Sequence, residues 1–191
     1  MPNIGLLDPR FKRVVVLSLL FASVLFCLPA TAQHMPQMEL FGGYSYLRFD
    51  SKPLGYADQS NLNGWTGSLT APHIFRELGI VADVSGNYGS GFREYNFLIG
   101  PQLTTDFRGF TVFARFLYGR ARDRVIVNGQ SPVGLSSLGR AIAAGGGVEK
   151  NLSPKLAFRV LQVDYIDANT LGQTQHNIRV ATGLVYRFGG K

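Results

Sequence analysis

The sequence predicts an all-β protein, an eight-stranded antiparallel up-and-down transmembrane β-barrel, and three observations lead to this fold class. The 191 residues are 46% hydrophobic and only 16% charged, with 23 glycines and 12% aromatic residues. This balance is typical of β-rich proteins and differs from that of disordered chains, coiled coils and collagen. Beyond the N-terminal segment, apolar and polar residues alternate with period two, without a sustained helical period. Turn-forming residues separate the alternating runs.

The N-terminal segment has the pattern of a secretory signal peptide. Basic residues precede the apolar run Val14–Leu28, which is short for a helix that must cross a bilayer. Ala30-Thr31-Ala32 then places small residues before a cleavage site at Gln33. We therefore expect residues 1–32 to form a cleaved signal peptide and residues 33–191 to form the barrel domain. The single cysteine lies in the signal segment, so we expect no disulfide in the mature chain.

Eight runs are predicted as strands: Glu39–Phe49, Gly64–Ala71, Leu78–Tyr88, Tyr95–Leu103, Thr111–Arg122, Leu138–Glu149, Ala157–Ile166 and His176–Phe188. In the second to fifth runs, one face is apolar and consists, in order, of Trp65 and Leu69; Leu78, Ile80 and Val84; Phe97, Ile99 and Leu103; and Val112, Ala114, Phe116 and Tyr118. The opposite face is polar or small, with Thr66 and Ser68; Gly79, Asp83 and Ser85; Asn96, Gly100 and Gln102; and Thr111, Arg115 and Gly119. Each run therefore suits a two-faced sheet.

The last run alternates most clearly, since Ile178, Val180 and Leu184 share one face while Asn177 and Arg179 share the other. The seventh run is ambiguous. Arg159 has the opposite parity to Gln162 and Asp164, which indicates a β-bulge between them.

A soluble barrel or sandwich would place the apolar face inside, whereas a transmembrane barrel would place it in lipid. Three features favour the membrane. The polar face carries small residues that a narrow lumen requires, namely Gly43, Gly79, Gly100, Gly119, Gly145, Gly147 and Gly183. That face lacks the Lys and Glu density of a soluble surface. Aromatic residues gather near run ends, as in membrane-interface girdles: Tyr44, Tyr46, Trp65, Tyr95, Tyr118, Tyr165, Tyr186 and Phe188.

The gaps between runs predict a topology of short turns alternating with longer outer loops. The outer loops are expected at Asp50–Asn63, Asp123–Ser137 and, at intermediate length, Asp167–Gln175. The short turns are expected at Pro72–Glu77, Thr104–Phe110 and Lys150–Lys155. Gly89–Glu94 departs from the rule because it is short where a long loop is expected. Because lipid tolerates no open sheet edge, the first and last runs should pair.

Several segments resemble the outer-membrane β-barrel family of OmpA-like small eight-stranded barrels: Glu39–Arg48, Asn63-Gly64-Trp65, Val81–Gly86 and Ala181–Phe188. The resemblance implies a Gram-negative cell envelope protein in the bacterial outer membrane. It also implies the barrel-assembly machinery and periplasmic chaperones as partners during biogenesis. In that family a terminal aromatic residue is recognised during assembly. Here Phe188 is followed by Gly189-Gly190-Lys191.

The inward face is expected to hold a lumen charge network of Glu39, Asp83, Arg115, Glu149, Arg159, Arg179 and Arg187. Charges of both signs in one narrow lumen should pair, because an unpaired buried charge is costly. We interpret the network as a plug that fixes the barrel, and a gated ion path is the alternative. The plug is favoured because eight strands leave little lumen.

A second basic cluster, Arg120, Arg122, Arg124 and Arg140, is expected at the outer rim. Guanidinium groups pair well with phosphate, so these residues are candidates for contact with lipopolysaccharide. The alternative is that they are ordinary strand-end charges that snorkel to water.

No motif indicates catalysis, since the sequence contains neither a G-x-S-x-G elbow nor an H-E-x-x-H pair. We therefore expect no enzyme, no cofactor and no metal site, and no nucleic-acid partner for an exported chain. The expected role is structural or surface interaction through the outer loops, toward an extracellular ligand that the sequence does not identify. A narrow porin-like channel for small solutes, a lipid-modifying enzyme and a soluble periplasmic β-barrel that binds an apolar ligand are the alternatives.

Overall fold

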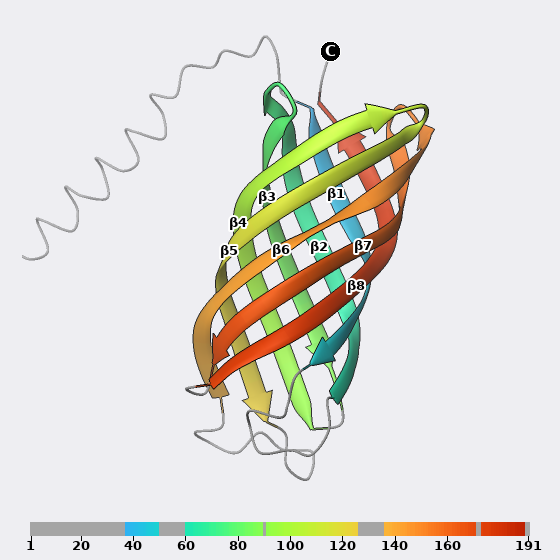
Figure 1. The fold of residues 1–191 in the computed structure, drawn as a ribbon. Coiled ribbons are helices and arrows are strands. Elements are labelled where there is room, and N and C mark those ends of the chain that lie inside the picture. The colour runs from blue at the N-terminus through green and yellow to red at the C-terminus, as the bar shows by residue number, and fades with distance from the viewer. Residues whose placement is uncertain (1–36, 50–59, 90, 126–135, 171–172, 190–191) are drawn as a thin grey trace, which may run out of the picture. The chain divides into compact units, whose positions relative to one another are not determined.

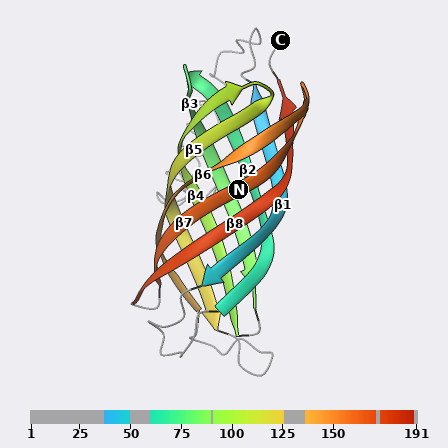
Figure 2. The same cartoon turned by 45° about the vertical axis from the view of Figure 1, so that its right-hand side comes forward.

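A computed structural model describes residues 37–49, 60–89, 91–125, 136–170 and 173–189. The predicted signal peptide, residues 1–32, lies outside the described residues. Eight strands form a closed antiparallel barrel in which each strand pairs with the next and β1 pairs with β8 (Figures 1 and 2). Their bounds are β1 Met38–Phe49, β2 Ser60–Phe75, β3 Leu78–Tyr88, β4 Phe92–Phe107, β5 Phe110–Val125, β6 Ser136–Ser153, β7 Leu156–Thr170 and β8 Gln173–Phe188. The predicted fold class is confirmed, as is the closure by the first and last strands.

The barrel has two distinct ends (Figure 1). At one end, which we call the turn end, β1 begins, β8 ends, and short turns join β2 to β3, β4 to β5 and β6 to β7. We call the opposite end, where the other connections lie, the loop end. The connection between β3 and β4 is the short one that the sequence predicts, with the Gly89 amide donating to the Phe92 carbonyl at 2.9 Å.

Most strands extend further than predicted, and one predicted loop is wrong. Residues 167–175 are mainly strand, because β7 continues to Thr170 and β8 begins at Gln173, with these two residues paired. The side chains of Thr170 and Gln175 face the polar lumen, so their hydrophilic character is compatible with a strand. In the other two predicted outer loops, residues 60–63, 123–125 and 136–137 belong to strands, and residues 50–59 and 126–135 lie outside the described residues.

The turn between β4 and β5 shows how local sequence sets the register. Arg108 and Gly109 have φ values of 45° and 83°, the two positive values of a type I′ turn, whose twist matches that of the flanking strands. Phe107 and Phe110 are therefore paired directly across the turn.

A β-bulge interrupts β7 where the sequence predicts one. The register of β7 against β8 shifts between Arg159 and Gln162. Val160 and Leu161 consequently both face outward, with 48% and 47% of their surface exposed, while Arg159 and Gln162 both face the lumen. The bulge therefore explains how Arg159 and the residues Gln162 and Asp164 can all face the lumen.

The outer face of the barrel is apolar along its length. Large hydrophobic side chains from several strands are about half exposed, among them Phe97 at 57%, Phe116 at 54% and Leu184 at 53%. Other charged side chains, such as Asp83 and Arg179, face inward and are fully buried. In the described part of the chain, no helix has the length and hydropathy to cross a membrane.

Candidate functional site in the barrel lumen

Four fully buried side chains form a closed ring of alternating charge, which we call the charge ring: Asp83 of β3, Arg115 of β5, Asp164 of β7 and Arg179 of β8. Arg179 donates from Nη1 to Asp83 Oδ1 at 2.9 Å and from Nη2 to Asp164 Oδ2 at 3.0 Å. Arg115 donates from Nε to Asp164 Oδ1 at 2.9 Å and from Nη2 to Asp164 Oδ2 at 2.8 Å. Its Nη1 lies 3.2 Å from Asp83 Oδ2. Three of its four contacts join strands that are not neighbours, and the ring therefore bridges the lumen.

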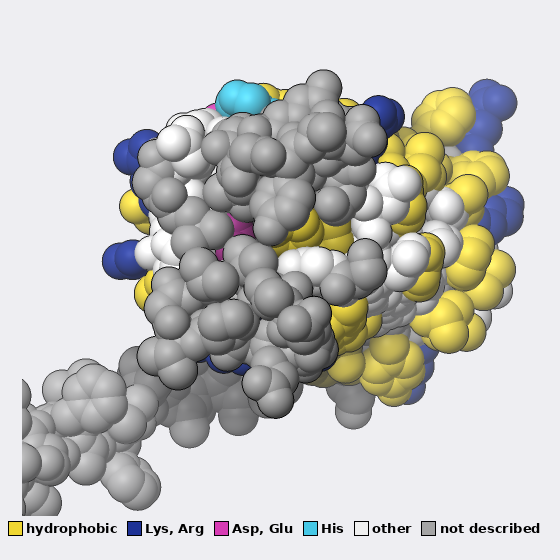
Figure 3. All heavy atoms as spheres, turned by 90° about the horizontal axis from the view of Figure 1, so that it is seen from below, with side chains coloured by type: hydrophobic (Ala, Val, Ile, Leu, Met, Phe, Trp, Pro, Cys, Tyr) yellow, Lys and Arg dark blue, Asp and Glu magenta, His cyan; other side chains and the backbone are white. Residues whose placement is uncertain are grey.

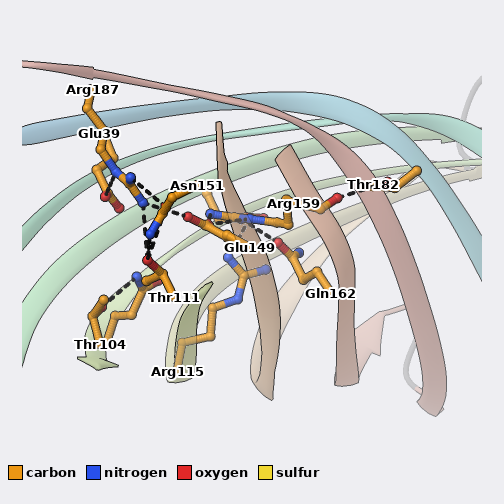
Figure 4. A network of polar contacts seen from close by, with 12 residues as sticks. Glu39, Thr104, Thr111, Arg115, Glu149, Asn151, Arg159, Gln162, Thr182 and Arg187 are labelled. Carbon is orange, nitrogen blue, oxygen red and sulfur yellow. Dashed lines mark hydrogen bonds and ion pairs between the residues drawn. The ribbon is translucent and has the colours of Figure 1, made fainter. Parts of the chain in front are cut away.

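A second set of ion pairs lies nearer the turn end, and we call it the turn-end network: Glu39, Glu149, Arg159 and Arg187 (Figure 4). Arg159 donates from Nε and Nη2 to Glu149 Oε1 at 2.9 and 2.7 Å. Arg187 lies between two carboxylates, 2.7 Å from Glu39 Oε1 and 3.2 Å from Glu149 Oε2. Because Arg187 comes from β8 and Glu39 from β1, this pair crosses the seam that closes the barrel.

Gln162 connects the two sets. Its Oε1 accepts from Arg159 Nη1 at 2.5 Å, and its Nε2 donates to Asp164 Oδ2 at 2.8 Å. The β7 bulge makes this link, because it turns both Arg159 and Gln162 inward.

Aromatic rings hold the Arg159 guanidinium in place. Its Cζ lies 3.9 Å from the ring centre of Phe41 and 4.5 Å from that of Phe113. Such cation–π contacts strengthen when the pair is removed from water. Space for the Phe113 ring depends on Gly147, because a Cβ atom added there would lie 2.7 Å from Phe113 Cζ.

These contacts determine what the lumen can do. The charge ring and the turn-end network contain four arginines and four carboxylates, each in an ion pair. Removing one partner of such a pair costs about 3–5 kcal/mol, because it leaves an uncompensated buried charge. The arrangement therefore links β1, β3, β5, β6, β7 and β8 through the lumen.

All seven residues of the predicted lumen charge network are buried, and the structure divides them between these two sets. Asp164 was absent from the predicted network because in a regular strand it would lie on the face opposite to Arg159. The bulge brings both side chains to the same face. The polar pair Gln162 and Asp164, alternating with Val163 and Tyr165, was the signal that marked it as inward-facing.

Two further buried carboxylates escaped sequence analysis, Glu94 of β4 and Asp123 of β5, which we call the loop-end acidic pair. They are directly paired across the two strands and are 0% and 1% exposed. Asn96 and Asn177 donate to Glu94 from their Nδ2 atoms at 2.6 and 3.0 Å, and Thr170 Oγ1 donates to Asp123 Oδ2. Figure 3 looks onto the loop end, where acidic side chains are visible near the middle of the view.

Inside the barrel, an apolar layer lies along the strands between the charge ring and the loop-end acidic pair. On β5, the residues Leu117 and Ala121 stand between Arg115 and Asp123, and both are fully buried. Leu98 and Ile166 join the same layer from β4 and β7. The two polar regions of the lumen are thus separated on this side by close-packed aliphatic side chains.

The structure places the predicted rim arginines on the outer face of the barrel. Arg120 of β5 is directly paired with Arg140 of β6, and both are exposed, as is Arg122. Arg124 is half-buried and is paired with Arg93 of β4, which the sequence analysis did not single out. We call these five residues the basic ridge. Like charges that face each other across a strand pair are unfavourable unless an anion lies nearby.

Comparison with known proteins identifies the fold. No protein-family model matches the sequence, and no curated protein matches it either. Among solved structures, Neisserial surface protein A is similar with a TM-score of 0.57 and 12% identity, over 80% of this chain and 96% of that chain. The attachment invasion locus protein Ail of Yersinia pestis has a TM-score of 0.56 and 16% identity, over 80% of this chain and 99% of that chain.

A second structure of Ail, in complex with the heparin analogue sucrose octasulfate, matches with a TM-score of 0.55 and 17% identity, over 80% of this chain and 98% of that chain. At these identities the similarity concerns the fold and not the chemistry of the site. The chain has the fold of the small eight-stranded outer-membrane β-barrels.

Proposed function

We propose that this protein is an integral barrel of the bacterial outer membrane with a structural or surface-interaction role. One observation carries the proposal, namely the inverted polarity of the barrel. Large apolar side chains such as Phe97 and Phe116 cover the outside, while charged side chains fill the inside. An apolar surface of this extent is unfavourable in water and suits hydrocarbon.

Aromatic side chains support this placement because they occur toward both ends of the barrel. Toward the loop end, Trp65 Nε1 lies 3.3 Å from the hydroxyl of Tyr88, which contacts Tyr95 edge to face. At the turn end, Phe107 and Phe110 flank the turn between β4 and β5, and both are exposed. Aromatic girdles at both lipid–water boundaries are a property of transmembrane barrels.

The same observations weigh against two of the alternatives, the soluble barrel and the channel. A soluble periplasmic β-barrel that binds an apolar ligand requires an apolar interior, yet the interior here holds the charge ring and the turn-end network. A narrow channel requires a continuous polar path, and the ion-paired side chains of the charge ring obstruct it. Strand orientation by the general rule for such barrels puts the turn end in the periplasm and the loop end outside. Surface contacts would then be made at the loop end.

Refolding tests the proposal. Purified protein would be diluted from urea into detergent micelles and into plain buffer, then run unheated and boiled on a denaturing gel. We expect a heat-dependent mobility shift only after refolding in detergent or lipid. A monomer that folds in plain buffer would contradict the membrane assignment, and the apolar surface would then require a different explanation.

We further propose that the basic ridge contacts the phosphates of lipopolysaccharide. The ridge lies on the outer face of β4, β5 and β6 toward the loop end, and Arg120 and Arg140 stand side by side there. A shared phosphate between two guanidinium groups would relieve their repulsion. We infer in addition that the barrel-assembly machinery and periplasmic chaperones handle the chain during biogenesis, with the stacked Tyr186 and Phe188 rings at the end of β8 as a recognition element.

Exchange of two arginines tests the lipid contact. Arg120→Gln combined with Arg140→Gln should weaken lipopolysaccharide binding by roughly thirtyfold, since each basic residue near an anionic lipid surface contributes about 1 kcal/mol. Binding is measured as lipopolysaccharide retained per barrel over a range of salt concentrations. Arg108→Gln, at the exposed turn end, is the matched control. Equal retention by both variants would reject the ridge as the binding surface.

A further inference from the structure

The loop-end acidic pair places two buried carboxylates opposite each other without a described cationic partner. Glu94 and Asp123 are directly opposite on adjacent strands, where paired side chains have Cβ atoms about 4.5–5.5 Å apart. Like charges at such positions are destabilising, and burial removes the solvent that would screen them. Among the described residues, no ion pair involves either carboxylate.

The count of buried charges in the lumen also shows that Glu94 and Asp123 lack cationic partners. The described buried ionisable side chains are four arginines and six carboxyl groups, a formal net charge of −2. The eight groups of the charge ring and the turn-end network balance one another, so the excess belongs to Glu94 and Asp123. Arg179, two residues beyond the Glu94 partner Asn177 on β8, already donates to both Asp83 and Asp164.

Buried oxygen atoms around the pair lack donors. Asp123 Oδ1, Asn96 Oδ1 and Gln175 Oε1 have no hydrogen-bond partner, although each side chain is at least nine-tenths buried. Asn87, fully buried on β3 and directly paired with Glu94, has no partner for either its Oδ1 or its Nδ2. These side chains thus have four oxygen acceptors without a donor and only one nitrogen donor without an acceptor. A bound cation would satisfy the unpaired oxygen atoms.

Hydrogen bonds and strand pairing together bring these side chains close to one another, because Glu94 is paired directly with both Asp123 and Asn87. Asn96 donates to Glu94, while Gln175 donates to Thr170, which donates to Asp123. Carboxylate oxygens supplemented by amide oxygens are the donor set that Ca²⁺ takes in proteins.

We propose that the loop-end lumen binds a divalent cation of the calcium type between Glu94 and Asp123, with amide oxygens of Asn87, Asn96 and Gln175 completing the site. The sequence predicted no metal site because it contains no H-E-x-x-H motif and no Cys/His set. The described residues also contain no group of three His, Cys, Asp or Glu side chains that could hold a metal. The proposed site differs from such groups because amide oxygens supply part of its donor set.

Cation-dependent stability tests the site. The full chain, exported and extracted in detergent, is heated in EDTA, in CaCl₂, in MgCl₂ and in NaCl of equal ionic strength, and the gel-mobility shift reports the folded fraction. We expect CaCl₂ to raise the unfolding midpoint by several degrees beyond NaCl, and calorimetric titration to find one Ca²⁺ per barrel. Glu94→Gln and Asp123→Asn should each lose the Ca²⁺ response. In EDTA, their midpoints should equal or exceed that of the wild type, because the repulsion is gone.

Asp167→Asn is the matched control, since this carboxylate is 43% exposed and lies outside the lumen on β7. It should keep the full Ca²⁺ response. The proposal is overturned if the wild type shows no response beyond NaCl, if the response survives in Glu94→Gln and Asp123→Asn, or if either variant fails to fold. Folding in detergent is read from the gel shift in EDTA, so a failure of the membrane assignment is distinguished from a failure of the cation site.

Discussion

At the scale of single residues, inward glycines decide whether the lumen can hold so many large side chains. A Cβ atom added at Gly145 would lie 2.3 Å from the Val163 carbonyl oxygen and 2.4 Å from Asp164 Oδ1. The glycine therefore leaves the room that one aspartate of the charge ring occupies. The sequence predicted this role from the position of the glycines on the polar face, whereas the side chain that each one accommodates required the structure.

Gly145→Ala should therefore lower the free energy of unfolding by about 1–3 kcal/mol, the usual cost of overpacking a well-filled interior. Urea titration of the detergent-folded barrel measures it. Gly42→Ala is the control, because a Cβ atom there meets nothing within 4 Å, and its effect should stay within about 0.5 kcal/mol. Equal losses in the two variants would show that the backbone, and not the contact with Asp164, sets the sensitivity.

At the scale of strands, the sequence predicted both bounds of β3 and the central part of the other strands, most of which extend further than predicted. The fourth predicted run began at Tyr95 and the fifth ended at Arg122, one residue short of Glu94 and Asp123 in each case. In a transmembrane barrel the inward face is polar, so a strand end whose lumen-facing residues are hydrophilic has the composition of a loop. The loop-end acidic pair was missed for this reason.

The bulge of β7 shows the complementary case, in which a break in the alternation was informative. Arg159 and Gln162 cannot share a face in a regular strand, and both are too polar for lipid. The sequence therefore required an irregularity between them, and the register shift occurs there. What the alternation could not supply was the partner of each side chain. Asp164 contacts Arg115 on β5, two strands away, across a distance that local patterning does not encode.

At the scale of the whole molecule, the charge ring acts as a cross-brace. Backbone hydrogen bonds join each strand only to its neighbours, whereas the ring joins β3, β5, β7 and β8 through the lumen. The Arg187–Glu39 pair adds a link across the closing seam of β8 and β1. If the network is a plug, its removal should lower the stability of the barrel. If it is a gate, its removal should raise the conductance.

Arg115→Ala separates the two interpretations. Removing this guanidinium leaves Asp83 and Asp164 with Arg179 as their sole ring partner, so a plug should lose about 3–5 kcal/mol of unfolding free energy. Single-barrel recordings in planar bilayers should show no added conductance, because the apolar layer around Leu98, Leu117 and Ile166 still stands in the lumen beside the charge ring. Arg120→Ala, an outward arginine on the same strand, is the control and should change stability little.

The opposite result would have an equally definite meaning. If Arg115→Ala opened an ion path without loss of stability, the ring would contribute to gating and not to bracing, and the aliphatic layer would have to yield to water. Packed aliphatic side chains resist such movement because a cavity among them forfeits contacts on every side. Stability and conductance therefore have to be measured on the same variant. Loss of a brace lowers stability alone, whereas loss of a gate raises conductance.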